Sequence, residues 1–429
     1  MYLTDRSAPP KAGAGQGPRR GPGRKVAPVV LVLGTVSLIT DISSEMVTAV
    51  LPLYLVTTLG FSPLGFGTLD GVYNGVSALV QLTGGHLADR IRNHKLLAGL
   101  GYGLSALCKP LLLLAGSIGT LGAVLALERT GKGLRTAPRD AMISLSTPAA
   151  KQGRAFGVHR AMDTTGAMLG PLAAFLILRA AVDGYDAVFG VSACVAALGV
   201  LVLVLFVPGR KRGGASDDAS TPAGADVPQG KQPVRIREAL ALLRVPRMRA
   251  LAGCAALLGL TTVSDAFVYL LLQRRAGIGE EWFPLLPLGT AAVFLLLAVP
   301  FGALADRIGR RTVFLAGHAV LLAAYALLLW APATSALPML VLALHGTFYA
   351  ATDGVLPAAL ADIVPSHLRA SGLAIVGTSQ ALARFCCSLA FGAAWTLWGD
   401  GPALAGSAIG LLCCALVAGM VLRPADGTR

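Results

Sequence analysis

Apolar stretches of about 20 residues recur along this chain, and their repetition limits the folds that it can adopt. A transmembrane helix needs about 20 consecutive, mostly apolar residues. The candidate stretches are 29–58, 64–88, 96–116, 119–141, 155–178, 187–207, 249–273, 283–305, 312–331, 337–361, 371–397 and 403–422. The charged fraction is 14%, against about a quarter in a typical soluble protein. The sequence therefore predicts an all-α membrane protein with twelve transmembrane helices.

Basic residues gather in every second loop between these stretches. With a cytosolic N-terminus, the cytosolic segments contain Arg90, Arg92, Lys95, Lys151, Arg154, Arg307, Arg310, Arg311 and Arg369. The external loops then contain Arg179, Arg274 and Arg275. Cytosolic loops of membrane proteins are enriched in Lys and Arg, so we expect both termini in the cytosol. The net charge of +14 is then explained by topology and anionic lipid, and not by nucleic acid.

The segments outside the apolar stretches divide the chain. The first 28 residues are rich in Pro, Gly and Arg, which is typical of a disordered tail. The apolar run after them is too long for a signal peptide and lacks a clear cleavage site. We expect a basic tail (1–28), a six-helix bundle (29–207), a cytosolic linker (208–248), a second bundle (249–422) and a short tail (423–429). The end of the linker, 234–243, is either a surface helix on the membrane or a solvated segment.

The two halves of the chain repeat one another. The second span of each half is followed by a similar loop, GGHLADRIRNHK at 84–95 and FGALADRIGRRT at 301–312. Two six-helix halves joined by a linker indicate a parallel repeat, and its binding site is expected between the halves near the middle of the membrane.

These loops resemble the G-x-x-x-D-R-x-G-R-R pattern of the major facilitator superfamily. The second loop matches it throughout, whereas the first has Arg92 where glycine is usual. LERTGKG at 127–133 and GAMLGP at 166–171 resemble further patterns of the family, the latter that of its exporters. The whole of 28–422 resembles a bacterial subgroup of efflux permeases. The resemblance implies the family fold, rocker-switch alternating access, a monomer in the bacterial cytoplasmic membrane, and export of a drug or metabolite.

The loop motifs indicate a latch that holds one conformation, or simply a device that sets loop shape. The residues concerned are Gly85, Asp89 and Arg90 in the first loop, and Gly302, Asp306, Arg307, Gly309, Arg310 and Arg311 in the second. The glycines would let helices approach closely, and the aspartates could bond arginines or a helix N-terminus. Gly166, Gly170 and Pro171 similarly predict a packing face on the fifth span.

Two acidic residues stand in the first span, where a charge is costly unless it faces a cavity or a partner. Asp41 and Glu45 are one helical turn apart and share a face. Repulsion and burial would favour a proton on at least one of them. We expect them to couple transport to protons or to contact substrate, the alternative being a structural ion pair. His159 and Asp163 in the fifth span are one turn apart and are further candidates for proton coupling, although His159 could equally be a packed core histidine.

The fourth span carries a polar stripe. Glu128, Lys132, Arg135 and Arg139 recur every three or four residues, with Arg129 on another side. Such a stripe would suit an anionic substrate if it faced a cavity. The alternative is pairing with nearby acids. The candidate substrate residues are Lys132, Arg135, Glu128, Arg129, Lys109, Asp265, Tyr269 and Tyr349, and we expect coupling mainly in the first half.

Other functional classes have no support in the sequence. It contains no P-loop, no zinc-binding spacing and no hydrolase motif, so we expect no cofactor, no metal and no enzymatic activity. The preferred hypothesis is proton-coupled export of a small organic molecule. The alternatives are an exporter of anionic metabolites or metal–carboxylate complexes, an importer or uniporter on the same fold, and a membrane enzyme or receptor on a transporter scaffold.

Overall fold

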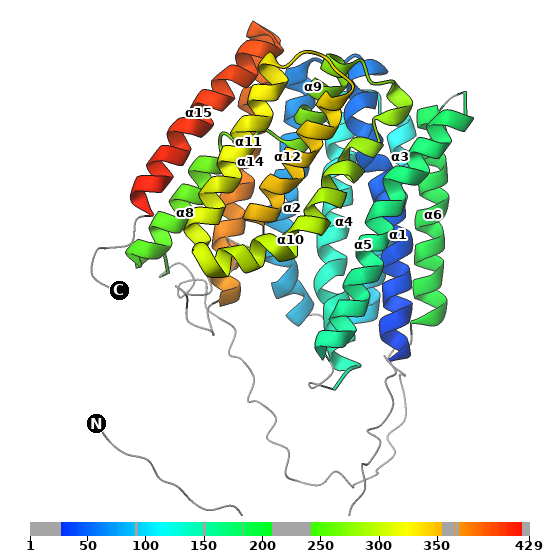
Figure 1. Ribbon diagram of the computed structural model, residues 1–429. Helices are drawn as coiled ribbons and strands as arrows, with labels where there is room; N and C mark the ends of the chain where they lie inside the picture. Colours follow the sequence, from blue (N-terminus) through cyan, green and yellow to red (C-terminus); the bar gives the residue numbers. More distant parts are fainter. Residues whose placement is uncertain are drawn as a thin grey trace, which may run out of the picture.

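The structure, a computed structural model, describes residues 27–90, 93–148, 152–182, 184–207, 242–353, 364 and 369–422. Within these residues the regular elements are helical (Figure 1). The first half contains α1 (Pro28–Thr57), α2 (Pro63–Arg90), α3 (His94–Leu114), α4 (Ile118–Leu145), α5 (Gln152–Ala180) and α6 (Gly184–Phe206). The second half contains η2 (Leu242–Arg244), α8 (Pro246–Gly259), α9 (Asp265–Ala276), η3 (Glu280–Trp282), α10 (Leu285–Ile308), α11 (Arg310–Trp330), α12 (Ala336–Thr352), α14 (Arg369–Trp398) and α15 (Asp400–Val421).

Eight helices in the described part are long and apolar enough to cross a membrane. Five of them are α1, α3, α6, α11 and α15, and a sixth covers η3 and α10. The remaining two lie within α5 and α14. The other predicted spans correspond to α2, α4, the α8–α9 pair and α12. α2 and α4 are more polar, the α8–α9 pair is interrupted and α12 is shorter. Twelve membrane-spanning helices therefore remain a prediction. The predicted tails, most of the linker with its surface helix, and the end of the tenth span lie outside the described residues.

The predicted span at 249–273 is not one continuous helix, because the helix is broken there. α8 ends at Gly259 and α9 begins at Asp265. The hydroxyls of Thr261 and Thr262 donate to the carbonyl oxygen of Leu258 at 3.0 and 2.9 Å, so side chains compete for the backbone groups of this segment. The freed N–H of Val263 donates to the Tyr325 hydroxyl at 2.8 Å. A broken helix is stable at membrane depth when neighbouring groups satisfy its backbone in this way.

The two halves stand side by side, with α1, α5 and α6 on the right of Figure 1 and α8, α11 and α15 on the left. We call the side at which α1 begins and α15 ends the terminal side; it is the lower side of Figure 1. The side at which α1 ends and α2 begins is the opposite side. This definition does not depend on the orientation in a membrane.

Within the first half, α5 packs directly against α1. A Cβ atom at Gly170 would lie 2.7 Å from the Cβ of Glu45, and one at Gly166 would collide with the backbone of Leu38. Membrane helices associate closely where small residues let their backbones approach, and these glycines provide such a surface. Pro171 follows them on α5 and lines the central cavity described below. The packing therefore fixes the acidic face of α1 against α5.

The halves meet toward the opposite side. The backbone N–H of Leu64, near the start of α2, donates to the Thr396 hydroxyl of α14 at 3.0 Å. A Cβ at Gly67 would collide with the backbone of Ser388, so α2 and α14 are in close contact. The rings of Phe66 and Phe267 lie edge to face at 4.7 Å between centroids. These contacts bring α2, α9 and α14 together above the centre of the molecule.

Candidate functional site

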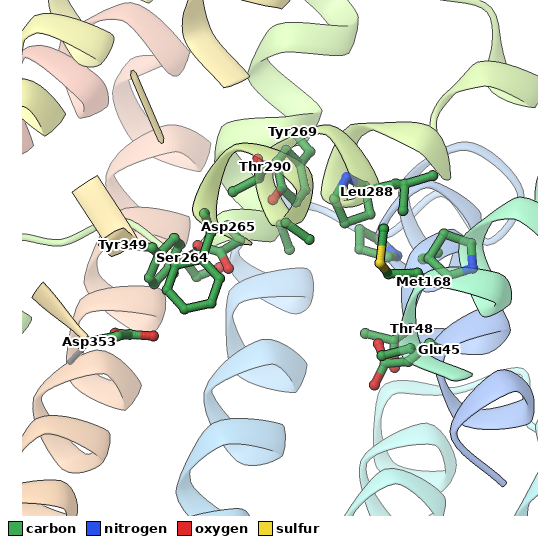
Figure 2. A pocket seen from close by; sticks show the side chains of 18 of the residues that line it. Glu45, Thr48, Met168, Ser264, Asp265, Tyr269, Leu288, Thr290, Tyr349 and Asp353 are labelled. Carbon is green, nitrogen blue, oxygen red and sulfur yellow. Dashed lines mark hydrogen bonds between the residues drawn. The ribbon is translucent and has the colours of Figure 1, made fainter. Parts of the chain in front are cut away.

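A cavity of about 580 Å³ lies between the two halves, and both halves contribute to its wall. Figure 2 shows Glu45, Thr48 and Met168 of the first half facing Asp265, Tyr349 and Asp353 of the second. The charged side chains in the wall are Glu45, Asp70, Arg160, Asp163, Asp265, Asp353 and Arg384. The aromatic ones are Tyr73, Tyr269, Phe283, Phe294 and Tyr349. Such a volume and such a mixture of apolar and polar groups are typical of a small-molecule site.

Glu45 of α1 reaches the cavity with a cation behind it. Its carboxylate lies 3.9 Å from the ammonium of Lys132 on α4, and both side chains are partly exposed. Thr48, one turn further along α1, also lines the cavity, and its hydroxyl lies 3.3 Å from that of Tyr73 on α2. The face of α1 that carries Glu45 and Thr48 is therefore a wall of the cavity.

Asp41, one turn before Glu45, lies behind this wall. It is 8% exposed, and its carboxyl lies close enough to the carboxyl of Asp163 on α5 for the two groups to interact. The guanidinium of Arg135 approaches Asp41 at 3.5 Å, and that of Arg139 approaches Asp163 at 3.6 Å. The arrangement is a pair of neighbouring carboxyl groups flanked by two arginines.

A polar network connects this pair to the interior of the first half. The Ser37 hydroxyl lies 3.0 Å from Nε2 of the buried His159 and accepts a hydrogen bond from Arg139 at 3.2 Å. The Tyr102 hydroxyl lies 3.3 Å from that of Ser37, and its ring stacks under Arg135 at 4.5 Å. His159 is thus a hydrogen-bonded core histidine beside the carboxyl pair, and the cavity wall does not include it.

The cations predicted to contact substrate have other partners. Glu128 pairs with Lys109 at 3.5 Å and with Arg129 at 2.7 Å, and all three are buried. Arg129 also lies over the ring of Tyr73, 3.8 Å from its centroid. The residues that line the cavity do not include Lys109, Glu128, Arg129, Lys132 or Arg135. The stripe of α4 faces α1 and α3, so its charges neutralise acids inside the first half, which differs from our expectation for substrate contact.

The second half places charged groups directly in the cavity wall. Asp265, the first residue of α9, accepts hydrogen bonds from the Tyr349 hydroxyl at 2.5 Å and lies 3.0 Å from Nε2 of His345. Arg384 of α14 lies close enough to interact electrostatically with both Asp265 and Asp353. The break between α8 and α9 is what brings Asp265 to the cavity.

Asp70 of α2 belongs to the site but was missed in the sequence. Its carboxylate accepts a hydrogen bond from the Ser388 hydroxyl of α14 at 2.5 Å, across the contact between the halves. Asn74, one turn later, also lines the cavity and donates to the Asp70 carbonyl oxygen at 2.9 Å. The sequence could have indicated Asp70, because an acidic residue within a predicted membrane span is by itself a candidate functional residue.

The loop motifs are described only in part. The side chains of Gly85, Asp89 and Arg90 fall outside the described residues. In the second loop, Asp306 pairs with Arg310 at 3.7 Å, and Arg311 donates to the Gly419 carbonyl oxygen of α15. Gly309 has φ +95°, which favours glycine at this turn between α10 and α11. Around Gly302, a Cβ would meet nothing within 4 Å, so the close helix approach expected there is absent. The role of these residues as a latch remains a hypothesis.

The chain is similar in sequence to a known protein family and to several of its members. The Major Facilitator Superfamily model matches residues 33–385 and 285–429. An uncharacterised MFS-type transporter of Methanocaldococcus jannaschii is 29% identical over 407 residues, which is 93% of this chain and 95% of that protein. An uncharacterised protein of Mycobacterium tuberculosis is 33% identical over 162 residues, 38% of this chain and 39% of that protein.

Solved structures share the fold at low sequence identity. The nucleoside transporter NupG superposes with a TM-score of 0.76 at 13% identity, covering 93% of this chain and 100% of that one. A bacterial homologue of the human lysosomal transporter Spinster, solved inward-facing and occupied, gives 0.69 at 16%, covering 93% and 97%. The paired halves, the cavity between them and the apolar helices are consistent with the family that the sequence match identifies. The chain belongs to the major facilitator superfamily and is a membrane-embedded, non-enzymatic transporter.

Proposed function

We propose that this transporter exports a small organic molecule in exchange for protons, by alternating access of the central cavity. The cavity of about 580 Å³ has the size of a site for a drug-sized ligand. Residues of both halves line it, so movement of one half against the other would change the access to all of them together. The family supplies the transporter class, and the following observations support the finer points.

The carboxyl pair of Asp41 and Asp163 carries the proposal of proton coupling. Asp163 lines the cavity, whereas Asp41 lies behind it. A proton that enters the cavity can therefore reach the pair through Asp163. Loss of this proton leaves two negative charges in contact, and each can then turn to its own arginine, Arg135 or Arg139. The pair joins α1 to α5, so its protonation state biases the relative position of these helices.

The contacts between the halves support alternating access. Beside the Leu64, Gly67 and Phe66 contacts, the Tyr185 hydroxyl at the start of α6 donates to the Glu280 carboxylate of η3 at 2.8 Å. All of these contacts lie toward the opposite side. They would have to break before the cavity could open there. The described conformation thus has the character of a state closed at the opposite side.

Orientation and direction rest on charge and on sequence pattern. The basic loops lie on the terminal side, which we assign to the cytosol. Outward transport is favoured by the exporter-like Gly166–Pro171 segment, whose glycines pack against the acidic face of α1. On this assignment the carboxyl pair takes up a proton outside and releases it inside, while the substrate moves outward.

The test uses purified protein in liposomes that are acidic inside and contain a pH-sensitive dye. Cationic, neutral and anionic compounds are added outside in turn. A compound that exchanges with protons raises the internal pH. In Asp41→Asn this proton movement should be lost, while exchange of labelled for unlabelled compound continues, because exchange needs no net proton transfer.

Asp400→Asn is the matched control. Asp400 lies in the first turn of α15, outside the cavity wall, and its carboxylate accepts from the Gly401 N–H at 2.8 Å, which an asparagine oxygen can also do. Its proton movement should match that of the unmodified protein. Compound exchange without proton movement in the unmodified protein would overturn the coupling and favour a uniporter.

A further inference from the structure

We propose that the transported molecule is an organic cation, held by its positive charge among Asp70, Asp265 and Asp353. This inference rests on the proposed function, since it assigns the substrate class to the same cavity. It differs from the anionic substrate that the stripe of α4 suggested.

The wall contains more acids than bases. Five acidic side chains line it (Glu45, Asp70, Asp163, Asp265 and Asp353) against two basic ones (Arg160 and Arg384). A wall of one sign raises the local concentration of molecules of the other sign, and low-dielectric surroundings strengthen the effect. The cations of α4 do not reverse it, because they lie behind the wall.

The acids of the first half already have cationic partners. Glu45 faces Lys132 at 3.9 Å. Asp163 has Arg139 and Arg160 on its two oxygens, each at 3.6 Å, in addition to its carboxyl partner. Little negative charge therefore remains for a ligand on this wall.

The acids near the second half share a single guanidinium. Arg384 lies within electrostatic reach of Asp70, Asp265 and Asp353. Among the described groups, the short contacts to Asp70 and Asp265 come from the hydroxyls of Ser388 and Tyr349 and from His345. Hydroxyl donors satisfy carboxylate oxygens but leave their charge in place. With all three acids ionised and the imidazole of His345 neutral, one arginine leaves two negative charges uncompensated.

A second feature of this region points to a ligand independently of the acids. Thr290 of α10 lines the cavity and is 5% exposed, yet its hydroxyl has no hydrogen bond of acceptable geometry in the described part. The Tyr269 hydroxyl is its polar neighbour. Buried polar groups are normally satisfied, so an unsatisfied hydroxyl beside an open volume is suited to a bound molecule.

The surrounding rings suit the same class of ligand. Tyr269, Tyr349, Phe283 and Phe294 line this part of the cavity. Aromatic faces attract desolvated cations, and quaternary ammonium groups are recognised in this way. Figure 2 shows Tyr269 and Tyr349 on the two sides of Asp265. A positive centre close to Asp265 would thus meet both carboxylate charge and aromatic surface.

The test compares two probes of matched shape and opposite charge, tetraphenylphosphonium and tetraphenylborate. Binding to the full chain in lipid nanodiscs is measured without a proton gradient, and binding to empty nanodiscs is subtracted. The phosphonium should bind and the borate should not. Asp265→Asn and Asp353→Asn should each weaken phosphonium binding about tenfold or more, because each removes a charge from a low-dielectric site.

Two controls separate charge from shape and from folding. Asp265→Glu keeps the charge and should retain more of the binding than Asp265→Asn. Asp400→Asn removes an acid outside the wall and should bind as the unmodified protein does. Thermal unfolding of each variant in nanodiscs confirms that the binding-deficient proteins are folded.

Three results would overturn the inference: absence of phosphonium binding, borate binding as tight as phosphonium binding, or a phosphonium affinity in both Asn variants equal to that of the unmodified protein. Failure of the proposed function is distinguishable. If phosphonium binds as expected but moves without protons, the coupling is wrong and the substrate class stands. If neutral or anionic compounds exchange with protons and cations do not, the coupling stands and the substrate class is wrong.

Discussion

The carboxyl groups of Asp41 on α1 and Asp163 on α5 lie beside one another, and each has an arginine of α4 as its partner, Arg135 at 3.5 Å and Arg139 at 3.6 Å. Glycines at 166 and 170 make this contact possible, because they bring the two helices together without side chains between them. The acidic pair and the glycine surface are thus parts of one interface. Packing in this interface and the site of the proposed proton are physically linked.

In the proposed mechanism the two carboxyl groups hold one proton between them, so they should act as a unit. Asp41→Asn and Asp163→Asn should each abolish compound-dependent proton movement, and the double variant should lose no more than either alone. Proton flux in liposomes, measured for the two single variants and the double variant, checks this. Additive partial losses in the single variants would show that the two acids work independently.

The glycine surface should tolerate no larger residue. Gly170→Ala adds a Cβ that would lie 2.7 Å from that of Glu45, so α1 or α5 has to shift. Overpacking of this kind costs about 1–3 kcal/mol. We expect a lower melting temperature in detergent. Gly302→Ala is the matched control, since its Cβ would meet nothing within 4 Å, and its melting temperature should not fall. Equal behaviour of the two variants would contradict the close α1–α5 packing.

Features that depend on local spacing could be predicted from the sequence. The helices of the first half lie within a few residues of the stretches that hydropathy locates, although α2 and α4 are more polar than the others. Asp41 and Glu45 are one turn apart and do lie on neighbouring turns of the same helix, next to the cavity. The glycines of α5 form a packing surface as their spacing predicts. These inferences need only the geometry of a single helix.

Features that depend on partners far along the chain could not be predicted. The break between α8 and α9 is stabilised by Tyr325, 62 residues after Val263, and a hydropathy window averages over the break. The direction of the α4 stripe depends on which helices pack beside it, and periodicity does not specify that. Asp70 gains its place from Ser388, at a separation of 318 residues. Each case requires tertiary structure.

The helix break should depend on the Tyr325 hydroxyl. Tyr325→Phe leaves the buried N–H of Val263 without its acceptor, and an unsatisfied buried group costs about 1–3 kcal/mol. We expect a lower melting temperature. Tyr102→Phe is the comparison, since Tyr102 is equally buried but its hydroxyl makes only a 3.3 Å contact with Ser37, which keeps His159 as a partner. A larger loss in Tyr102→Phe than in Tyr325→Phe would contradict this account of the break.

The contact between Tyr185 and Glu280 should hold the opposite side closed. Tyr185→Phe removes the 2.8 Å hydrogen bond between the halves while keeping the ring that packs on Tyr54. A hydrogen bond of this kind contributes about 0.5–1.5 kcal/mol, which corresponds to a shift of about two- to tenfold toward the conformation open at the opposite side. A cysteine at the cavity residue Thr48 should then react faster with a membrane-impermeant maleimide from that side.

Two features of this experiment make its result specific. The exposed Cys194, Cys386 and Cys413 are first replaced by serine, so that the reagent reports on position 48. Tyr54→Phe provides the control, because Tyr54 packs on the rings of Tyr185 and Phe189 but has no hydrogen bond across the halves among the described contacts. Its labelling rate should stay that of the parent. If Tyr185→Phe also leaves the rate unchanged, the contact does not hold this side closed, and the closure has to come from the packing of α2 against α14.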